Sequence, residues 1–459
     1  MTSNYDLVII GSGSGNSLVT PDFEDWRIAL VEQNPVFGGT CLNVGCIPTK
    51  MFVYPADLAD NSAHAERLGL TPHRLEAEWP AIRDRIFGRI DPISVAGRAY
   101  RESGTRNVTL LETHAEFSGP RQLLLGTGET ITAEHVVLAA GSRAVVPDVV
   151  RDSGVPFHTS DTIMRLDELP ERLLILGGGY IAAEFAHVFS AFGSHTTVAT
   201  RSTLLREHDH DVTSRLADLV RDKWHLRTRT TARSVRRVGD EIVVGFDGGD
   251  EVRADTLLVA TGRQPNGDRL NLTAGGVATH PDGRVVADEY QRTSAAGVWA
   301  LGDVSSAARL KHVANHEARV VAHNLAHPHD LLTADHRFIP SAVFTHPQIA
   351  SVGLTEQRAR ATGVPYVAAV QHFSSTAYGW AMEDAAGICK VLAEPGTGRL
   401  LGAHILGEQA STLIQPIIQA MSFGLPAREM ARGQYWIHPA LTEVVENALL
   451  GLPLQSSPR

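Results

Sequence analysis

This sequence has few cysteines and no excess of basic charge. Three cysteines in 459 residues cannot form the dense disulfide framework of a small secreted protein, so that class is excluded. The chain has 41 lysines and arginines against 51 aspartates and glutamates, for a formal net charge of −10. A protein of that charge does not neutralise a nucleic-acid backbone or an anionic bilayer, so we expect neither as a partner.

Long apolar runs and a leader sequence are missing as well. The apolar runs 7–10 and 173–176 have the length of strands and fall far short of the ~20 residues that cross a bilayer. The start, MTSNYDLVII, has no basic segment and no cleavage site of the secretory type. We therefore expect a protein of the reducing cytoplasm without a membrane span.

The chain does contain enough apolar material for large cores, with 43% hydrophobic and 20% charged residues. Its length suggests about three domains at roughly 150 residues each. After about residue 337 the pattern changes to short strand-like runs and one helical pattern over 413–423, which indicates a separate α+β domain.

Two segments share one order of features, namely an apolar strand, a glycine cluster and a helix-permissive stretch. The first has Gly11 and Gly13 after its strand. Glu32 follows Gly11 by 21 residues, where a carboxylate accepts hydrogen bonds from an adenosine ribose. This combination favours dinucleotide binding over a plain turn. Asn16 replaces the third glycine and Pro21 interrupts the following helix, so we expect that helix to be short.

The second segment has Gly177 and Gly179, followed by a predicted helix over 181–192. Its next strand ends in Arg201, with Arg206 close behind, where an NADH-binding protein has an acid. Cations at this place suit a ribose 2′-phosphate, so the sequence predicts NADPH. The alternative is a solvated surface pair.

Cys41 and Cys46 are two of the three cysteines and lie five residues apart. This spacing differs from the Cys-x-x-Cys pairs of zinc sites, and no metal site is expected. On a helix the two would point about 140° apart, so a disulfide needs a distorted turn, which Gly45 allows. A nearby helix N-terminus would favour the thiolate. The alternative is a structural pair of free thiols; Cys389 is interpreted as a buried small hydrophobe.

Two further places carry candidate polar groups. Asp303 follows the short strand 298–301 and could hold the hydroxyl groups of a ribityl chain, although Gly-Asp after a strand can be a simple turn. His438 and Glu443 flank a proline, and the carboxylate could orient the imidazole as a general acid or base. With 21 histidines in the chain, an ordinary structural histidine is the alternative.

These patterns, together with segments 260–263, 301–303 and 438–443, occur in the order seen in the flavin-dependent pyridine nucleotide-disulfide oxidoreductases. The chain resembles this family over nearly its whole length. The resemblance implies an α/β fold with two Rossmann-like dinucleotide-binding domains and a C-terminal α+β dimerisation domain, as in glutathione reductase. It divides the chain into an FAD-binding domain (1–146 and, after a return, 269–336), an NADPH-binding domain (147–268) and an interface domain (337–459).

The resemblance also implies a relay in which NADPH reduces FAD, FAD reduces the Cys41–Cys46 disulfide, and the dithiol reduces a small disulfide substrate. Cys46 would face the flavin and Cys41 would attack the substrate. The resemblance further implies a homodimer, an ion pair beside the flavin, an aromatic gate over the nicotinamide, and a set of cofactor-binding residues. The implied residues are His438 and Glu443 of the other subunit, the pair Lys50 and Glu184, the gate Tyr180, and for the cofactors Gly11, Gly13, Glu32, Gly39, Thr40, Gly141, Asp303, Gly177, Gly179, Arg201, Arg206 and Gly262.

Within the family, the chain is most similar to the branch that reduces mycothione, a sugar-linked disulfide. Similar segments are 11–17, 50–54, 87–92, 310–316, 378–384 and 431–437. Glutathione reductases present an arginine to a substrate carboxylate from the stretch that here is 17–22, and this stretch has no cation. A carboxylate-poor substrate is therefore predicted.

Other flavoproteins with related sequences are alternatives to this interpretation. Dihydrolipoamide dehydrogenases share the relay but use NAD, which Arg201 disfavours. A glutathione reductase is a further alternative. Mercuric reductases and large thioredoxin reductases carry an extra redox pair near the C-terminus, and the end of this chain has none. A structural or regulatory flavoprotein would not need to retain both cysteines and the His438–Glu443 pair.

Overall fold

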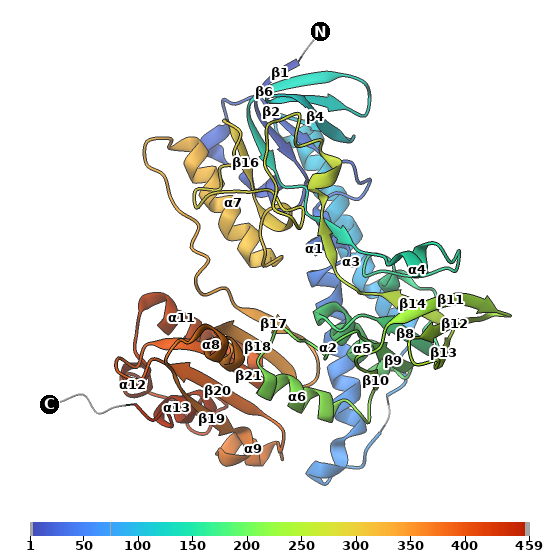
Figure 1. The fold of residues 1–459 in the computed structure, drawn as a ribbon, viewed down its shortest axis with the longest axis vertical. Helices are drawn as coiled ribbons and strands as arrows, with labels where there is room; N and C mark the ends of the chain where they lie inside the picture. Colours follow the sequence, from blue (N-terminus) through green and yellow to red (C-terminus); the bar gives the residue numbers. More distant parts are fainter. Residues whose placement is uncertain (1–2, 74, 455–459) are drawn as a thin grey trace.

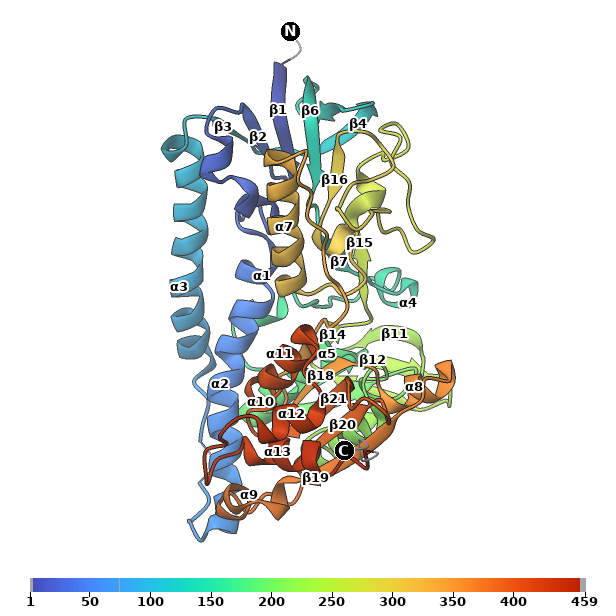
Figure 2. The same cartoon turned by 90° about the vertical axis from the view of Figure 1, so that its left-hand side faces the viewer.

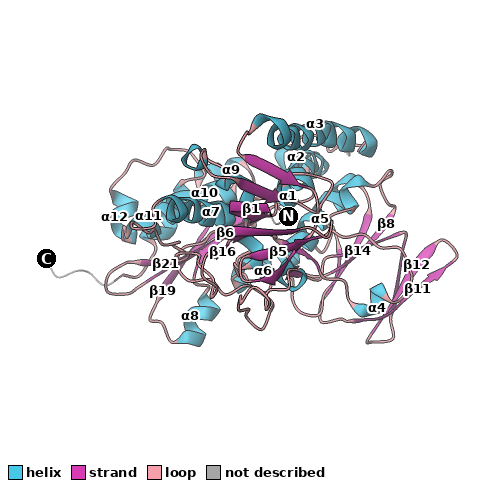
Figure 3. Cartoon of the chain, turned by 90° about the horizontal axis from the view of Figure 1, so that it is seen from above, coloured by secondary structure: helices cyan, strands magenta, loops and turns pink. Residues whose placement is uncertain are grey.

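A computed structural model describes residues 3–73 and 75–454 of the protein. The chain forms three parts (Figure 1), with the first glycine turn in the upper part, the second in the green part below it, and the C-terminal segment in the orange and red part. Helices and strands are mixed in all three (Figure 3). Among the residues described, no helix has the length and apolar character needed to cross a bilayer.

The upper part is built on a sheet in the order β3-β2-β1-β6-β5-β4, with β16 beside β6. Strands β1, β2, β3, β6 and β16 run parallel, and β4 and β5 add antiparallel neighbours. The central strands read as nearly continuous apolar runs because helices and loops bury both faces. The strands are β1 Ser3–Ile10, β2 Ile28–Val31, β3 Val108–Leu111, β4 Ala115–Gly119, β5 Gln122–Leu125, β6 Thr130–Leu138 and β16 Val298–Ala300.

The segment after the first glycine turn is short, as predicted. It forms a 3₁₀ turn, η1 (Gly15–Leu18), and Pro21 begins a second turn, η2 (Pro21–Phe23). Asn16 accepts a hydrogen bond from Arg101 Nε at 2.7 Å. The α-helices of this part are α1 Gly39–Asn43, α2 Cys46–Ala63, α3 Trp79–Ala99 and α7 Lys311–Ala326.

The second part is inserted into the first, because the chain returns through β16 to the sheet that β1 began. The two connecting segments pair as an antiparallel ribbon, β7 (Ser142–Ala144) with β15 (Arg263–Pro265). The inserted part has a parallel sheet in the order β10-β9-β8-β14 and an antiparallel sheet β11-β12-β13. Its elements are α4 Asp148–Arg151, β8 Arg172–Leu176, α5 Tyr180–Phe192, β9 His195–Ala199, α6 His210–Leu219, β10 His225–Arg227, β11 Ala232–Val238, β12 Glu241–Phe246, β13 Glu251–Ala254 and β14 Thr256–Val259.

The C-terminal part is a five-stranded antiparallel sheet, β17-β18-β21-β20-β19, with helices packed on it. The single helical pattern expected over 413–423 is wrong at its start, because α10 ends at Leu413 and α11 begins at Gln415. Pro416 lacks a backbone N–H and therefore starts a helix more readily than it continues one. The elements are β17 Ser341–Val343, β18 Gln348–Gly353, α8 Glu356–Thr362, β19 Val367–His372, α9 Ala377–Ala381, β20 Ile388–Ala393, β21 Leu400–Gly407, α10 Ala410–Leu413, α11 Gln415–Phe423, α12 Ala427–Arg432 and α13 Glu443–Leu450.

Helix α2 connects the parts. It starts in the upper part and runs down into the lower half of the molecule (Figure 2). Its buried Phe52 stacks on Trp79 of α3 at 4.9 Å, and Trp79 contacts Phe189 of α5 at 5.2 Å. These rings bury a large apolar area, so they hold the amino end of α2 in place beside α5.

Candidate active site

The first glycine turn lies at the carboxyl end of β1. Gly11 has a φ of +110°, and a Cβ atom there would lie 2.4 Å from the carbonyl oxygen of Ala139. The turn therefore requires glycine. The N–H groups of Gly13 and Ser14 have no hydrogen-bond partner within residues 3–73 and 75–454. Free N–H groups at this edge are the type of site that binds a pyrophosphate.

Helix α1 begins directly beside this turn. Gly39 has a φ of +75°, and a Cβ atom there would lie 2.6 Å from the Cα atom of Gly13, so the two backbones pack against each other. Thr40, in the first turn of α1, lines the same cavity as Gly13. Lys311 donates a hydrogen bond from Nζ to the Ser14 hydroxyl at 2.8 Å. This ammonium group adds positive charge where an anionic ligand would lie.

The predicted ribose acceptor, Glu32, follows β2 directly. One carboxylate oxygen accepts hydrogen bonds from the N–H and hydroxyl of Ser12, at 2.9 and 2.6 Å, and the other accepts one from the Asn34 N–H at 2.8 Å. The Ser12 hydroxyl also accepts a hydrogen bond from the Gly38 N–H at 2.9 Å. The buried Ser12 therefore joins the glycine turn, Glu32 and the start of α1.

The two cysteines lie on either side of a break between helices. Cys41 is in α1 and Cys46 is the first residue of α2, with Gly45 between the two helices. A Cβ atom on Gly45 would lie 2.9 Å from the Thr40 carbonyl oxygen, so glycine permits the tight connection. The distorted turn and the helix N-terminus that the sequence predicted are both present. Both cysteines are free thiols in this structure.

The environment of the pair separates the two thiols chemically. A hydrogen bond from Cys41 lowers the pKa of Cys46 to about 7, and the positive charge of Lys50 acts in the same direction against the effect of burial. The same hydrogen bond, together with burial, raises the pKa of Cys41. Near neutral pH the reduced pair therefore keeps a proton on Cys41 and a thiolate on Cys46, the form that reacts in thiol–disulfide exchange.

Lys50 and Glu184 form the predicted ion pair across the contact between α2 and α5. The Nζ and Oε2 atoms are 2.5 Å apart. The other oxygen of Glu184, whose side chain is buried, accepts the Phe344 N–H at 3.0 Å, and the Lys50 Nζ lies 4.4 Å from the centre of the Phe344 ring. The pair is thus held from three parts of the chain, and Lys50 is one turn of α2 from Cys46.

One cavity of about 1380 Å³ brings most of the predicted residues together. It is larger than the ~300–1,000 Å³ of ordinary small-molecule pockets, which suits a dinucleotide. The predicted residues that line it are Gly11, Gly13, Glu32, Gly39, Thr40, Cys41, Cys46, Lys50, Gly141, Tyr180, Glu184 and Asp303.

The far side of the cavity is formed by the segments that connect the first two parts. Asp303 accepts a hydrogen bond from the Ser142 hydroxyl at 2.5 Å, and Arg263 Nε donates to the same hydroxyl at 2.8 Å. Gly141 has a φ of +67° and no neighbour that a Cβ atom would meet within 4 Å. The free N–H groups, the two carboxylates and this open glycine together fit a flavin dinucleotide, whose phosphates and hydroxyls need donors and acceptors of these kinds.

The second glycine turn repeats the first. A Cβ atom on Gly177, at φ +136°, would lie 2.1 Å from the Ala260 carbonyl oxygen. Gly179, which precedes α5, and Gly262 would meet nothing within 4 Å. Since no described residue occupies that space, a glycine at position 179 leaves room for a ligand at the N-terminus of α5. Tyr180 lines the main cavity from the first position of this helix.

Arg201 and Arg206 lie in the loop after β9, outside the lining of the main cavity, and both are exposed. Arg206 forms an ion pair with Glu207 at 2.8 Å, in which both side chains are largely solvated. An exposed pair of this kind contributes little to stability, so both arginines are available to bind an anion.

His438 and Glu443 contact each other but lie apart from the cavity of their own chain. The His438 Nδ1 atom is 2.8 Å from a Glu443 oxygen, and the His438 side chain is 72% exposed. Neither residue lines the main cavity. The neighbouring Tyr435 and Ile437 are also exposed, so an apolar surface surrounds this imidazole.

Several residues of the site lie outside the set predicted from the sequence, among them Ser12, Ser142 and Lys311. Ser12 and Ser142 line the cavity and bond to the predicted Glu32 and Asp303, and Lys311 lines it and bonds to Ser14. Ser12 could have been found, because it stands within the glycine turn itself. Lys311 and Ser14 are 297 positions apart in the sequence, so no local sequence pattern predicts their hydrogen bond.

The family model for pyridine nucleotide-disulphide oxidoreductases matches residues 5–318, and that for the dimerisation domain of the same family matches residues 339–449. The chain therefore belongs to the pyridine nucleotide-disulfide oxidoreductases, a family of enzymes. The expected fold is confirmed: two Rossmann-like units are followed by an α+β dimerisation domain.

Two relatives by sequence and one solved structure show which members of the family this chain is similar to. Mycothione reductase of Mycobacterium tuberculosis (strain ATCC 25618 / H37Rv) is 54% identical over 98% of this chain and 99% of its own. Mercuric reductase of Streptomyces lividans is 35% identical over 96% of this chain and 94% of its own. The solved structure of the HOCl-induced flavoprotein disulfide reductase RclA from Escherichia coli superimposes with a TM-score of 0.84 at 27% identity, covering 97% of this chain and 99% of that one.

Proposed function

We propose that this enzyme uses NADPH, through bound FAD, to reduce mycothione to mycothiol in the cytoplasm. The observation that carries the proposal is the Cys41–Cys46 pair in one cavity with the first glycine turn and the Lys50–Glu184 ion pair. The 54% identity to mycothione reductase over nearly the whole chain supports the choice of substrate. We also propose the domain boundaries predicted from the sequence, with the interface domain from residue 337.

The first half of the proposed reaction reduces the cysteine pair. Bound FAD supplies the chemistry that converts a hydride from NADPH into an electron pair for the Cys41–Cys46 disulfide. The glycine turns and Glu32 bind the dinucleotides, and Asp303 orients the flavin end. Lys50, held by Glu184, places a positive charge beside Cys46 and so favours its thiolate as soon as the disulfide opens.

The second half reduces the substrate by two exchange steps. Cys41 loses its proton to His438 of the partner subunit and attacks one sulfur of the substrate disulfide, whose S–S bond breaks. The released thiolate takes the proton back from the imidazole, and the other half of the substrate stays bound to Cys41 as a mixed disulfide. The Cys46 thiolate then attacks the Cys41 sulfur, which restores the Cys41–Cys46 disulfide and releases the second half of the substrate as a thiolate that takes a proton from water.

A homodimer with a shared site is part of this proposal. The dimerisation domain of the family covers residues 339–449, which include His438 and Glu443. Their imidazole–carboxylate pair is assembled, exposed and absent from the lining of the cavity in its own chain. A partner subunit could therefore accept it at the mouth of its own cavity.

The substrate is proposed to carry few carboxylates. The segment 17–22 contains no lysine or arginine. Its one charged residue, Asp22, accepts a hydrogen bond from the Thr20 hydroxyl at 3.1 Å. An acidic tripeptide disulfide such as glutathione disulfide would lack a counter-charge there. Turnover should therefore favour a sugar-linked disulfide.

The test is NADPH oxidation with mycothione, glutathione disulfide and lipoamide under one set of conditions. We expect mycothione to be reduced with a kcat/KM at least 100-fold above the other two, and the Cys41→Ser and Cys46→Ser variants to lose this activity while they retain flavin. Comparable turnover of glutathione disulfide would refute the substrate assignment. Full activity in either serine variant would refute the relay.

A further inference from the structure

The loop between β9 and α6, residues 200–209, contacts the second glycine turn directly. The N–H of Leu205, a residue with a φ of +50°, donates a hydrogen bond to the Gly178 carbonyl oxygen at 2.7 Å. The same loop carries Arg201 and Arg206. A shift of this loop therefore moves both arginines relative to the glycine turn.

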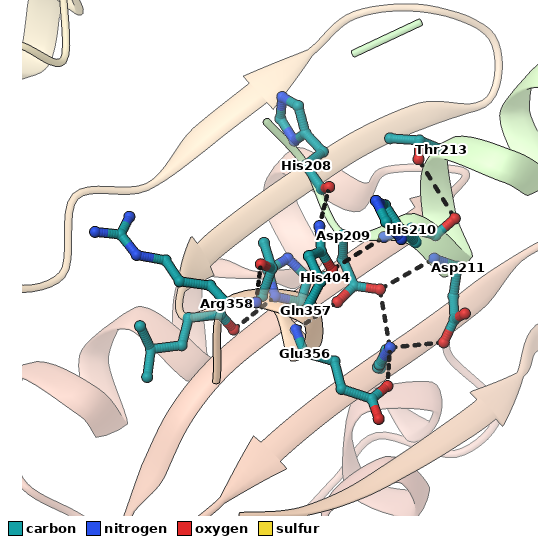
Figure 4. A network of polar contacts seen from close by, with 12 residues as sticks. His208, Asp209, His210, Asp211, Thr213, Glu356, Gln357, Arg358 and His404 are labelled. Carbon is teal, nitrogen blue, oxygen red and sulfur yellow. Dashed lines mark hydrogen bonds and ion pairs between the residues drawn. The ribbon is translucent and has the colours of Figure 1, made fainter. Parts of the chain in front are cut away.

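The end of this loop is held by the C-terminal domain (Figure 4). Gln357 donates from Nε2 to the His208 carbonyl oxygen at 2.7 Å, and the Ser351 hydroxyl lies 3.1 Å from His208 Nδ1. Asp209 accepts the N–H of Glu356 at 2.8 Å. These contacts join β18 and α8 to a segment of the nucleotide-binding part.

A buried lysine completes the attachment. Lys390 of β20 is 1% exposed, and its Nζ contacts carboxylate oxygens of Asp209 at 2.9 Å, Asp211 at 2.6 Å and Glu356 at 2.6 Å. Burial opposes its charge, but hydrogen bonds with the three carboxylates outweigh burial and raise the pKa of Lys390. Removing one member of such a cluster leaves buried charges unpaired, so the cluster holds its shape strongly.

Asp209 links this cluster to the loop. It is fully buried, caps the N-terminus of α6 through the Asp211 N–H at 3.1 Å, and receives Lys390 on the same oxygen. The position of residue 209 is thus set from the C-terminal domain, and the loop that ends there has little freedom. Lys390 and its three carboxylate partners do not line the main cavity.

We infer that Lys390 is a positioning residue for the pyridine nucleotide: the dimerisation domain, through Lys390, Glu356 and Gln357, holds the loop 200–209 in the geometry that binds NADPH. The inference rests on the proposed binding of the 2′-phosphate by Arg201 and Arg206. It assigns to the C-terminal domain a second task besides dimerisation, since the same sheet would set the affinity for the reductant.

The test compares steady-state constants of the flavin-loaded enzyme for three variants, Lys390→Met, Glu356→Gln and Gln357→Ala. The control is Lys223→Met, which removes another ion pair of the nucleotide-binding part (to Asp60, 2.5 Å) but no contact to the loop. We expect KM for NADPH to rise about tenfold in Lys390→Met, which corresponds to about 1.4 kcal/mol of lost binding free energy, and to rise less in Gln357→Ala, which removes a single hydrogen bond. KM for the disulfide substrate and kcat should stay within about twofold, and KM for NADH should change less than KM for NADPH.

Each outcome bears on the inference. An unchanged KM for NADPH in the folded variants would overturn it, and so would an equal rise in Lys223→Met, which would show general loosening. If Lys390→Met does not fold, the KM for NADPH of Glu356→Gln and Gln357→Ala tests the inference in its place. If Arg201→Ala leaves KM for NADPH unchanged while Lys390→Met raises KM for both NADPH and NADH, then the loop is positioned as inferred and the assignment of the 2′-phosphate site fails on its own.

Discussion

Replacement of Cys41 by alanine tests the origin of the reactive thiolate. The hydrogen bond from Cys41 is the largest influence that lowers the pKa of Cys46 from 9.0 to about 7. A hydrogen bond to a charged group is worth about 1.5–3 kcal/mol. At 1.36 kcal/mol per pKa unit, its loss should raise the pKa of Cys46 by about 1–2 units, to about 8–9. The thiolate fraction at pH 7 would then fall from about one half to about 1–10%.

The assay is the rate of alkylation of the reduced, flavin-loaded enzyme by iodoacetamide between pH 5 and 10. In the Cys41→Ala variant the rate at pH 7 should fall about 5- to 50-fold relative to the parent, and the two rates should converge at high pH. Cys389 does not interfere, because it is fully buried and burial raises its pKa to about 12. Cys389→Ala is therefore the matched control and should behave as the parent.

A pKa of Cys46 that stays near 7 without Cys41 would refute this reasoning. The low pKa would then have to come from Lys50 and the amino end of α2. Lys50→Met distinguishes the two sources, since we expect it to raise the pKa of Cys46 by less than Cys41→Ala does.

The remaining predictions concern the reductant, the proton and acid stability. Arg201→Ala together with Arg206→Ala should raise KM for NADPH by about 10- to 100-fold and leave KM for NADH unchanged, since only NADPH has a 2′-phosphate; steady-state kinetics check this. His438→Gln should lower kcat for the disulfide by about 10²–10⁴ without slowing reduction of the enzyme by NADPH in a stopped-flow experiment. Burial lowers the pKa of His208 and of His346 to about 4, so both are neutral when folded and bind protons more readily when unfolded. In urea denaturation the contribution of these two histidines to the free energy of unfolding should therefore be constant above pH 7 and fall between pH 6.5 and 4 by on the order of 6 kcal/mol, about 3 kcal/mol for each histidine.

The surroundings of His346 show that polar side chains from segments distant in the sequence meet in the folded protein. Its ring stacks near that of His187, at 6.1 Å between centres, and His187 Nε2 lies 2.7 Å from an Asp57 oxygen. Asp57 and His187 continue the contact of α2 with α5 that Lys50 and Glu184 begin, so polar pairs recur along that helix contact. Partners of this kind cannot be read from the chain, because they join segments more than 100 residues apart.

Features confined to one stretch of chain were determined by the sequence itself. Gly11 and Gly177 stand where a strand must turn within one residue, Pro21 begins a new 3₁₀ turn and does not continue the first one, and Gly45 lets Cys41 and Cys46 approach. Each follows from backbone sterics and short spacings, which do not depend on what packs nearby. The start of the helix expected at 413 was misplaced because Pro416 outweighed the apolar periodicity around it.

The tertiary structure alone decided which distant groups meet. The ion pair of Lys50 with Glu184 was expected from family resemblance, and its geometry exists only because α2 packs on α5. The Lys311–Ser14 bond and the Lys390 cluster had no signal in the sequence. Hydrophobic periodicity tells which face of an element is buried, but the partner of a buried charge is chosen by the packing of whole elements, and that choice is made only when the three parts come together.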